Sequence, residues 1–284
     1  MEISDGAVRI LAGMLETRSG QQLGQGRRWR IETELRPLMK ARGIETLDGF
    51  VDHLVRGGEP HLADIVVDAL LNNETFFFRD VAAFDLLEQK GLGRLRHARG
   101  ETTRRLRIWC AACSTGQEAY SLAMLIADMP RLWDGWTVDI LASDVSHSAI
   151  DRAREGLYSQ LEIQRGLPVR RMLRYFRKEG EQWRIDPAIR RMVRFQAHNL
   201  VEQPPLGLFD LILCRNVLLY FSGDVRRLVL GRLAGAIAPD GVLMLGAGET
   251  VIGNSDAFVS DYEARGLYRP RLDLSRSGAA GRAA

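Results

Sequence analysis

The sequence holds only three cysteines among its 284 residues. Three thiols are too few for the disulfide framework of a small secreted domain, so we expect a protein of the reducing cytoplasm. The chain also lacks a run of about 18 apolar residues, which a membrane-spanning helix needs. Its first residues lack the basic and then apolar pattern of a signal peptide. We therefore expect no insertion into a membrane.

An excess of charge of one sign is also missing from the chain as a whole. The 39 Lys and Arg against 36 Asp and Glu give a net charge of +3, which is weak support for nucleic-acid binding. The exception is residues 165–194, which hold ten Lys or Arg and three Asp or Glu. This segment is either an ordinary solvated surface or a binding site for an acidic protein or nucleic acid.

Two patterns of hydrophobicity divide the chain. Residues 1–72 show only helical spacing of apolar side chains, for example Leu11 with Leu15, and predict a helical bundle. From Arg105 onward, short β-rich runs alternate with helical stretches, which predicts βαβ units and a parallel sheet. The expected strands are Leu106–Ala111, Val138–Ala142, Val193–Ala197, Leu208–Leu213 and Val242–Gly246, and the helices between them are Glu118–Asp128, Ser148–Gly156 and Asp224–Ile237.

These patterns predict four parts along the chain. They are a helical bundle (1–72), a linker (73–104), an α/β domain (105–270) and a Ser-, Gly-, Ala- and Arg-rich tail (271–284) that we expect to be frayed.

Polar residues follow three predicted strands, and ligands of open α/β sheets bind beyond the carboxyl ends of strands. Gly116 lies in a small-residue turn after the first strand, which indicates either close approach of a ligand or only tight packing. Asp144 follows the second and suits a ribose diol, or else caps the next helix. Asn199 and Leu200 follow the third and suit the edge and face of a base, or form a plain turn.

The glycine pattern limits the class of cofactor that the chain is expected to bind. The turn at Gly116 is neither the G-x-G-x-x-G pyrophosphate clamp nor a phosphate loop, since no Lys follows it. The chain therefore favours an adenosine-bearing cofactor without a pyrophosphate, and S-adenosylmethionine fits better than NAD or ATP. The pair Cys110 and Cys113 forms one C-x-x-C, which is weak support for a redox or metal site.

Two further segments carry unusual residues. Asn72–Asp80 places three consecutive Phe beside Asn, Thr and Arg, which suggests an aromatic wall with a fixed cation. Alternatively, Phe76 and Phe77 form a hydrophobic plug between two domains. Leu213–Phe221 follows the fourth strand and combines Arg, Asn and Tyr.

With these segments the chain resembles the CheR family, the chemotaxis-receptor glutamate methyltransferases, over nearly its whole length. The motifs that carry the resemblance are N-x-T-x-F-F-R-D at 73–80, C-S-T-G-x-E-x-Y-S at 113–121, S-D-V at 143–145, A-R-x-G-x-Y at 153–158 and C-R-N-V-x-x-Y-F at 214–221. The resemblance implies a class I methyltransferase fold, Rossmann-like with a mostly parallel sheet, an N-terminal helical domain and a small inserted β-subdomain, expected here at about 173–195 with Gly180 at a hairpin turn.

The resemblance also implies the site. Arg79 and Tyr220 would lie next to the methyl group that is transferred, and Glu118 would meet the amino-acid end of the cofactor or a nearby polar group. The implied S-adenosylmethionine site consists of Asn73, Thr75, Arg79, Glu118, Asp144, Asn199, Leu200, Arg215 and Asn216. No metal is implied, and S-adenosylhomocysteine would be the product.

A carboxylate acceptor suits these residues. A glutamate side chain is ionised at pH 7, so transfer needs no general base, and none of the five histidines falls in the three main motifs. We expect Arg79 to orient the substrate carboxylate and Tyr220 to form a hydrogen bond near the methyl group. The expected partner is the cytoplasmic domain of a bacterial methyl-accepting chemoreceptor, and we expect a monomer that binds no nucleic acid.

The chain departs from the family pattern at several places. Gln117 and Ala119 stand where Glu and Pro are common, and both changes are tolerable because Glu118 and Tyr120 remain. A basic helix, which resembles the family's substrate-facing helix, is interrupted by Glu34 and Pro37, so the identity of the substrate is left open. Its basic residues are Arg27, Arg28, Arg30, Arg36 and Lys40.

The hairpin expected around Gly180 is short. Family members that bind a receptor's C-terminal pentapeptide tend to have a longer, Gly-rich hairpin, so we expect an enzyme that needs no such tether. Two other functions remain open at this point. One is a cofactor-binding scaffold without catalysis. The other is a nucleic-acid methyltransferase, although Cys214–Val217 replaces the N/D-P-P-Y/F loop typical of amino methylation of bases.

Overall fold

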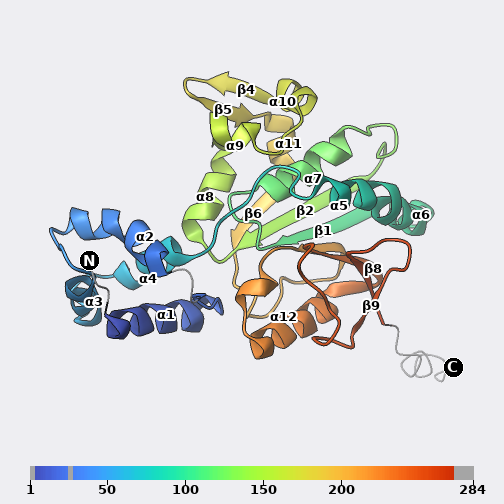
Figure 1. The fold of residues 1–284 in the computed structure, drawn as a ribbon. Coiled ribbons are helices and arrows are strands. Elements are labelled where there is room, and N and C mark those ends of the chain that lie inside the picture. Colours follow the sequence, from blue (N-terminus) through green and yellow to red (C-terminus); the bar gives the residue numbers. More distant parts are fainter. Residues whose placement is uncertain (1–3, 25–27, 272–284) are drawn as a thin grey trace.

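The computed structural model describes residues 4–24 and 28–271 (Figure 1). Arg27 of the expected basic helix and the tail from residue 272 lie outside the described residues, as does the side chain of Arg28. Within the described part of the chain, no helix is long and apolar enough to cross a membrane.

Four helices fill the N-terminal region and confirm its helical periodicity. They are α1 (Asp5–Ser19), α2 (Arg28–Ala41), α3 (Leu47–Val55) and α4 (Leu62–Leu70). Each turns an apolar stripe inward, so that side chains such as Leu11, Ile31 and Phe50 are fully buried in a core of their own. Figure 1 shows this bundle beside the sheet and not stacked on either of its faces.

The main sheet has seven strands in the order β6-β2-β1-β7-β8-β10-β9. Only β10 runs antiparallel to its neighbours, so the predicted mostly parallel sheet is confirmed. The order reverses between β1 and β7, which is where open α/β sheets bind ligands. The strands are β1 (Arg105–Ala111), β2 (Thr137–Asp144), β6 (Val193–Ala197), β7 (Phe209–Cys214), β8 (Ile237–Leu245), β9 (Phe258–Ser260) and β10 (Leu267–Pro270).

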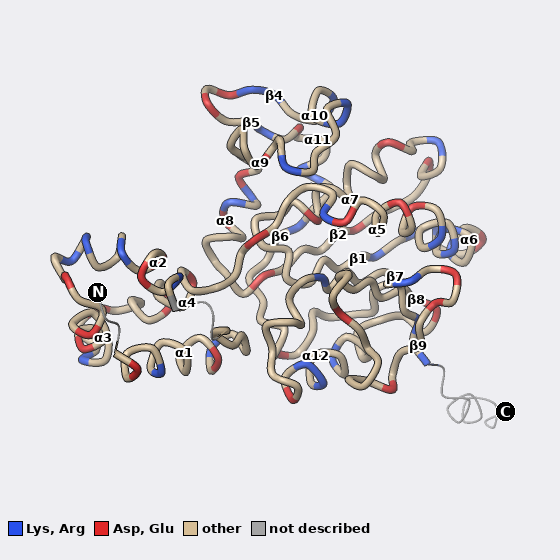
Figure 2. The backbone as a smooth tube through the Cα atoms, viewed as in Figure 1, with Lys and Arg blue, Asp and Glu red and all other residues tan. Residues whose placement is uncertain are grey.

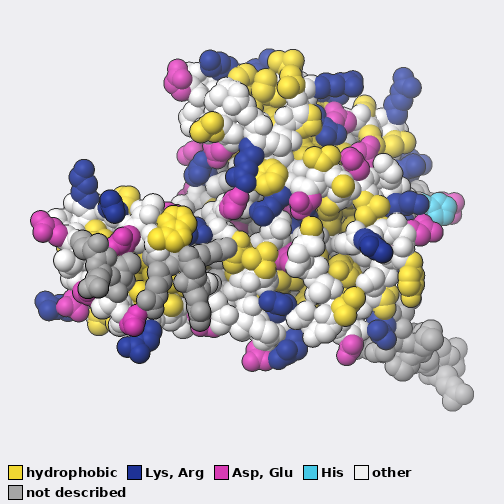
Figure 3. Space-filling view, in the orientation of Figure 1, with side chains coloured by type: hydrophobic (Ala, Val, Ile, Leu, Met, Phe, Trp, Pro, Cys, Tyr) yellow, Lys and Arg dark blue, Asp and Glu magenta, His cyan; other side chains and the backbone are white. Residues whose placement is uncertain are grey.

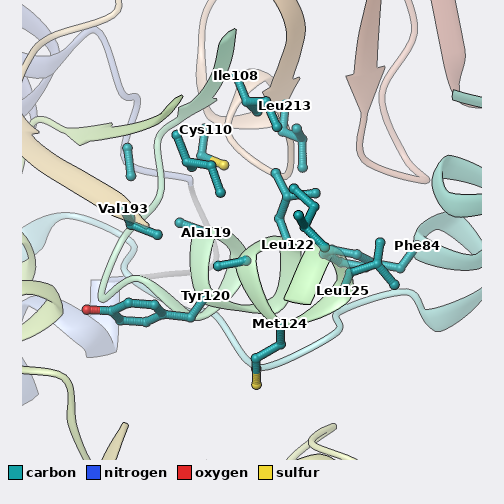
Figure 4. Close-up of a cluster of buried hydrophobic side chains, with 14 of the residues drawn as sticks. Phe84, Ile108, Cys110, Ala119, Tyr120, Leu122, Met124, Leu125, Val193 and Leu213 are labelled. Atoms are coloured by element: carbon teal, nitrogen blue, oxygen red, sulfur yellow. The ribbon is translucent and has the colours of Figure 1, made fainter. Parts of the chain in front are cut away.

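Helices cover both faces of this sheet. On one face α7 (Gln117–Ala127) packs its apolar residues onto β1, β6 and β7 (Figure 4), and on the other α12 (Gly223–Ala236) packs against a separate apolar cluster. The helix α8 (His147–Glu155) follows β2, and a short 3-10 turn, η3 (Leu218–Tyr220), follows β7.

The segment expected to be a linker is largely helical. It forms α5 (Val81–Leu86), a π-helical turn η2 (Leu87–Leu92) and α6 (Gly93–Gly100). Its side chains Phe84, Leu87 and Leu95 are buried in the same core as α7. Residues 71–80 form a connecting segment between the bundle and α5, with a turn at 77–78, bends at 79–80 and no helix or strand.

A second, three-stranded sheet of order β3-β5-β4 projects from the domain (Figure 1). It begins earlier than the expected 173–195, because β3 is only three residues long and too short to show a strand pattern; residues 193–195 instead belong to β6. Gly180 lies at the β4–β5 turn with φ +59°, as predicted. The elements are β3 (Leu157–Ser159), α9 (Gln160–Gln164), α10 (Val169–Tyr175), β4 (Phe176–Glu179), β5 (Gln182–Ile185) and α11 (Pro187–Arg191).

Figure 2 shows the Lys and Arg residues of this inserted region concentrated along α10 and the small sheet. Many of them pair with carboxylates, which neutralises much of the local positive charge that the sequence shows. The pairs are Arg165 with Glu74, Arg171 and Arg174 with Asp128, Arg184 with Glu179, and Arg194 with Asp139.

Candidate active site

A pocket lies at the carboxyl ends of the central strands, with about 750 Å³ of empty space that includes open solvent. The bundle contributes Ser19 and Gln21 to its wall, so both parts of the chain enclose it. All the predicted site residues line it: Asn73, Thr75, Arg79, Glu118, Asp144, Asn199, Leu200, Arg215, Asn216 and Tyr220.

The turn after β1 is shaped by left-handed backbone. Ala112, Ser114 and Gly116 have φ of 63°, 50° and 93°. A Cβ on Gly116 would lie 2.9 Å from the Cβ of Ala153, so packing as well as conformation requires glycine here. The Ser114 amide donates to Asp144 Oδ2 (2.7 Å), and its hydroxyl donates to the Asn73 carbonyl oxygen (2.8 Å). The turn thereby holds β1, β2 and the connecting segment together at the pocket.

Asp144 is the last residue of β2 and is buried. Its Oδ1 accepts from the Ser146 amide (3.0 Å), while Ser146, not Asp144, caps α8, so the capping alternative is wrong. Burial raises the pKa of Asp144, and the amides of Ser146 and Ser114 oppose this by stabilising the carboxylate. A buried carboxylate with two fixed amide donors suits further hydroxyl donors from a ligand.

A buried ion-pair cluster forms the opposite wall. The Arg215 side chain, 1% exposed, donates to Glu118 Oε2 (3.0 Å) and to Asp80 Oδ2 (2.7 Å). Burial raises the pKa of Glu118, and the Arg215 charge opposes the shift. Glu118 Oε1 and Arg215 Nε are buried without a hydrogen-bond partner. Since unpaired buried polar atoms cost about 1–3 kcal/mol, they suit a ligand that carries complementary groups.

The three consecutive Phe residues divide between two environments. Phe77 and Phe78 are buried, and Phe77 contacts Tyr158 and Phe176 edge-on, so the hydrophobic plug consists of Phe77 and Phe78 and not of Phe76. Phe76 stays half-exposed, with the Arg79 guanidinium 5.5 Å from its ring centroid. Phe76 thus has a guanidinium near its ring, but it is not among the residues that line the pocket.

The bundle holds Tyr220 from two sides. The Asn72 side-chain amide donates to the Tyr220 hydroxyl, and the Gln22 backbone N–H donates to the Tyr220 carbonyl oxygen (2.7 Å). Arg30 on α2 donates in turn to Asn72 Oδ1 (2.9 Å) and to the Leu71 carbonyl oxygen (2.8 Å). Arg30, a residue of the predicted basic helix, is thus held against the connecting segment and also lines the groove beside α2 and α4.

Asn199 lines the pocket with a side chain that is already engaged. Its Nδ2 donates to the Arg18 carbonyl oxygen (2.8 Å), and its Oδ1 accepts from the Val201 amide (3.2 Å). Beside it, His198 also lines the pocket, and its Nδ1 is buried without a hydrogen-bond partner. His198 follows the same predicted strand as Asn199, but it is not among the predicted site residues because it lies outside the family motifs.

Glu249 is a positioning residue that sequence reasoning missed. Its carboxylate accepts from four backbone amides, those of Asn216 (2.7 Å), Val217 (2.9 Å), Leu218 (2.7 Å) and Gly246 (2.8 Å). Asn216 has φ +59°, a conformation that this anchoring stabilises. Glu249 thus fixes the loop that carries both Asn216 and Tyr220. A Glu after a buried strand and two glycines is the one signal that could have indicated it.

A family model described as "CheR methyltransferase, SAM binding domain" matches residues 73–264, more than half of the chain. The chain belongs to the CheR methyltransferase family. A "Chemotaxis protein methyltransferase 1" of Pseudomonas aeruginosa is 40% identical over 258 residues, 88% of this chain and 92% of that protein. The "Chemotaxis protein methyltransferase Cher2" of Pseudomonas putida is 37% identical, with 86% and 90% covered. A "Chemotaxis protein methyltransferase 1" of Vibrio cholerae is 36% identical, with 90% and 93% covered.

This CheR-family protein is a methyltransferase with S-adenosylmethionine as its cofactor. The pocket fits such a molecule on chemical grounds. The orphaned Glu118 Oε1 and Arg215 Nε suit the ammonium and carboxylate of an amino-acid end, and the Asp144 carboxylate suits hydroxyl groups.

The cysteines of this CheR-family protein give the redox interpretation no support. Cys110, Cys113 and Cys214 are buried free thiols, and burial raises the pKa of each well above its usual value. A buried thiol with a raised pKa forms little thiolate and is a poor nucleophile or metal ligand.

Proposed function

We propose that this protein methylates glutamate side-chain carboxylates on methyl-accepting chemoreceptors, giving methyl esters and S-adenosylhomocysteine. One observation carries the proposal: Arg79 and Tyr220 line the same pocket as the Asp144 carboxylate and the buried Glu118–Arg215 pair. The names of the three relatives as chemotaxis protein methyltransferases support the choice of substrate.

In this proposal the chain's own residues hold the cofactor at three points. Asp144 binds the ribose hydroxyls, Glu118 and Arg215 bind the amino-acid end, and the turn at Asn199 and Leu200 lies against the base. Because both side-chain ends of Asn199 are engaged by Arg18 and Val201, its contribution comes from its backbone. Asn73, Thr75, Arg79 and Asn216 complete the cofactor site.

When bound, S-adenosylmethionine supplies an electrophilic methyl group on a positively charged sulfur. The acceptor glutamate needs no general base, since a carboxylate is already ionised at pH 7. Arg79 orients this carboxylate, and the Tyr220 hydroxyl forms a hydrogen bond near the methyl group. Such alignment can lower the activation free energy by roughly 7–11 kcal/mol. Strong stabilisation of the anion would slow the reaction, because the acceptor loses charge in the transition state.

The proposed partner is the cytoplasmic domain of a receptor, bound without a pentapeptide tether by a cytoplasmic monomer that binds no nucleic acid. The β4–β5 hairpin supports independence from a tether, because only Gly180 and Glu181 connect its two strands.

The test is transfer of radiolabelled methyl from S-adenosylmethionine to purified cytoplasmic fragments of chemoreceptors from the same organism. We expect label that is released by mild base, as methyl esters are, and that Arg79→Ala and Tyr220→Phe each reduce kcat. Full activity in both variants would overturn their roles. Cofactor binding without transfer to any receptor would instead support a non-catalytic scaffold, and salt-sensitive RNA binding in a gel shift would support a nucleic-acid substrate.

A further inference from the structure

Arg165 is an arginine at the edge of the pocket that belongs to none of the family motifs. It follows α9, on the inserted region, and its Nη2 lies 2.6 Å from Glu74 Oε1. Its guanidinium also lies over the Phe76 ring, 4.5 Å from the centroid. Glu74 itself lines the pocket and the adjoining groove beside α2 and α4, so Arg165 is paired with a residue that both share.

The backbone holds Arg165 in this place. Gly166 has φ +82°, and a Cβ there would lie 2.1 Å from the Phe77 carbonyl oxygen. Only glycine permits the loop to approach the connecting segment so closely. The position of Arg165 relative to Phe76 is therefore set by packing of the main chain and not by its surface ion pair alone.

Arg79 shares the same aromatic ring. Its guanidinium is 5.5 Å from the Phe76 centroid, and its Nη1 donates to the Glu74 carbonyl oxygen (2.9 Å). Two guanidinium groups from different parts of the chain thus converge on Phe76 and Glu74. Figure 3 shows positive and negative side chains around exposed hydrophobic ones at the centre of this face, where the bundle, the sheet and the inserted region meet.

The Glu74 carboxylate, which pairs with Arg165, can be replaced by a carboxylate of an incoming protein. The side chains of Arg165 and Glu74 are 52% and 53% exposed, and exposed ion pairs contribute little net free energy. Glu162, the acidic residue nearest in sequence, is engaged by Ser159 and Arg152 instead. A carboxylate on a docked protein can therefore exchange with Glu74 at little cost.

We propose that Arg165 forms a second carboxylate-binding subsite, which binds an acidic side chain of the protein substrate close to the glutamate being methylated. The proposal rests on the proposed function, in which Arg79 binds the acceptor carboxylate. The two guanidinium carbons lie 5.5 Å and 4.5 Å from one ring centroid and are therefore at most about 10 Å apart. Acidic residues one turn apart on a helix, with Cβ atoms about 5–6 Å apart and flexible side chains, can span such a separation. The enzyme then prefers glutamates that have an acidic neighbour.

The experiment compares wild type, Arg165→Ala, Arg165→Lys and Arg170→Ala, an exposed arginine on α10 that serves as the matched control. Each is assayed for kcat and KM on a chemoreceptor cytoplasmic fragment, and on the same fragment with the neighbouring acidic residue changed to Ala. Calorimetric titration with S-adenosylmethionine shows whether each variant retains the folded cofactor site.

We expect Arg165→Ala to raise KM about tenfold, because the docked substrate shields its carboxylate on Arg165 from water and so makes this pair stronger than the exposed pair with Glu74. We expect kcat and cofactor affinity to stay unchanged. We expect the KM of Arg165→Lys to lie between those of wild type and Arg165→Ala, because Lys keeps the charge but lacks the planar guanidinium group. Removing the substrate's acidic neighbour raises KM for wild type and not further for Arg165→Ala. Arg170→Ala behaves as wild type.

An unchanged KM in Arg165→Ala overturns the subsite and leaves the proposed function intact. The same holds if the effects on KM of Arg165→Ala and of removing the substrate's acidic neighbour are additive. An equal rise in KM for Arg170→Ala also overturns it, since the effect is then one of general surface charge. Absence of methyl transfer by wild type to any receptor fragment overturns the proposed function, and the subsite with it.

Discussion

Two buried carboxyl groups face the pocket, and their surroundings differ. Asp144 is held by backbone amides, whereas Glu118 is held by the Arg215 guanidinium. Burial raises the pKa of both. The ionised form of each accepts hydrogen bonds more strongly and alone balances an ammonium group. Protonation therefore weakens cofactor binding at a higher pH than it would for an exposed carboxyl group.

We therefore predict that affinity for S-adenosylhomocysteine falls as the pH is lowered from about 7 toward 5, above the usual range of Asp and Glu. The sign follows from the raised pKa values, because the binding-competent carboxylates are lost as pH falls through them. Asp144→Asn binds more weakly at every pH and shows a shallower dependence. Calorimetric titration measures this, with Asp139→Asn, on β2 outside the pocket, as the control. A flat profile for wild type contradicts the prediction.

Single residues also show where sequence reasoning stops. Asp144 could be selected because it closely follows a predicted strand, and ligands of open α/β sheets bind beyond the carboxyl ends of strands. Asn72 and Glu249 could not, because their partners lie in distant segments, Asn72 reaching Tyr220 and Glu249 reaching the Asn216 loop. A residue that acts by holding a distant residue in place leaves no recognisable pattern in the sequence around it.

At the scale of elements, the loop after β7 depends on one carboxylate from the loop after β8. We predict that Glu249→Gln lowers the free energy of unfolding by about 1–3 kcal/mol, since the amide nitrogen cannot accept from the backbone N–H groups. It should also reduce kcat, because the loop positions Tyr220. Urea unfolding and steady-state kinetics test this against Glu263→Gln, an exposed glutamate paired with Lys90. Equal stability of both variants contradicts the anchoring role.

The connecting segment also positions a residue of the site, because its Asn72 contacts the Tyr220 hydroxyl. Asn72→Ala removes the donor to the Tyr220 hydroxyl and the acceptor for Arg30. We predict a fall in kcat of about tenfold, of the order of one hydrogen bond to a charged or reacting group, with cofactor affinity unchanged. Because both changes act through one contact, adding Tyr220→Phe to Asn72→Ala should cost less than it does in wild type. Steady-state kinetics of the four proteins test this, and additive effects would show that Asn72 acts elsewhere.

Helices and strands could be predicted where they are long enough to show a hydrophobic periodicity in the sequence. The five predicted strands match β1, β2, β6, β7 and β8, although β8 begins five residues earlier, at Ile237. The strands β3, β9 and β10 have three or four residues, too few for alternation to be visible, and the sequence did not indicate them. The helices α5 and α6 escaped notice because their segment was interpreted as a linker.

At the scale of the whole molecule, the bundle and the sheet share one pocket. Gln21 lines it and forms an isolated β-bridge with Phe221, while Asn72 and Tyr220 meet across it. We predict that S-adenosylhomocysteine slows amide hydrogen exchange at residues 19–22 and 72–75 as well as at the strand ends, because ordering the pocket orders both of its walls. Exchange measured by mass spectrometry tests this, and protection confined to residues after 104 contradicts it.

The bridge between Gln21 and Phe221 has a consequence for recombination among relatives. Exchanging the bundle of one family member for that of another, as a route to new substrates, separates residues that meet at this bridge and at Tyr220. A chimera that joins foreign bundles at residue 72 would have to carry compatible partners for Phe221 and Tyr220, or its cofactor pocket would lose a wall. The integrity of the cofactor pocket in this chain therefore depends on the bundle as well as on the sheet.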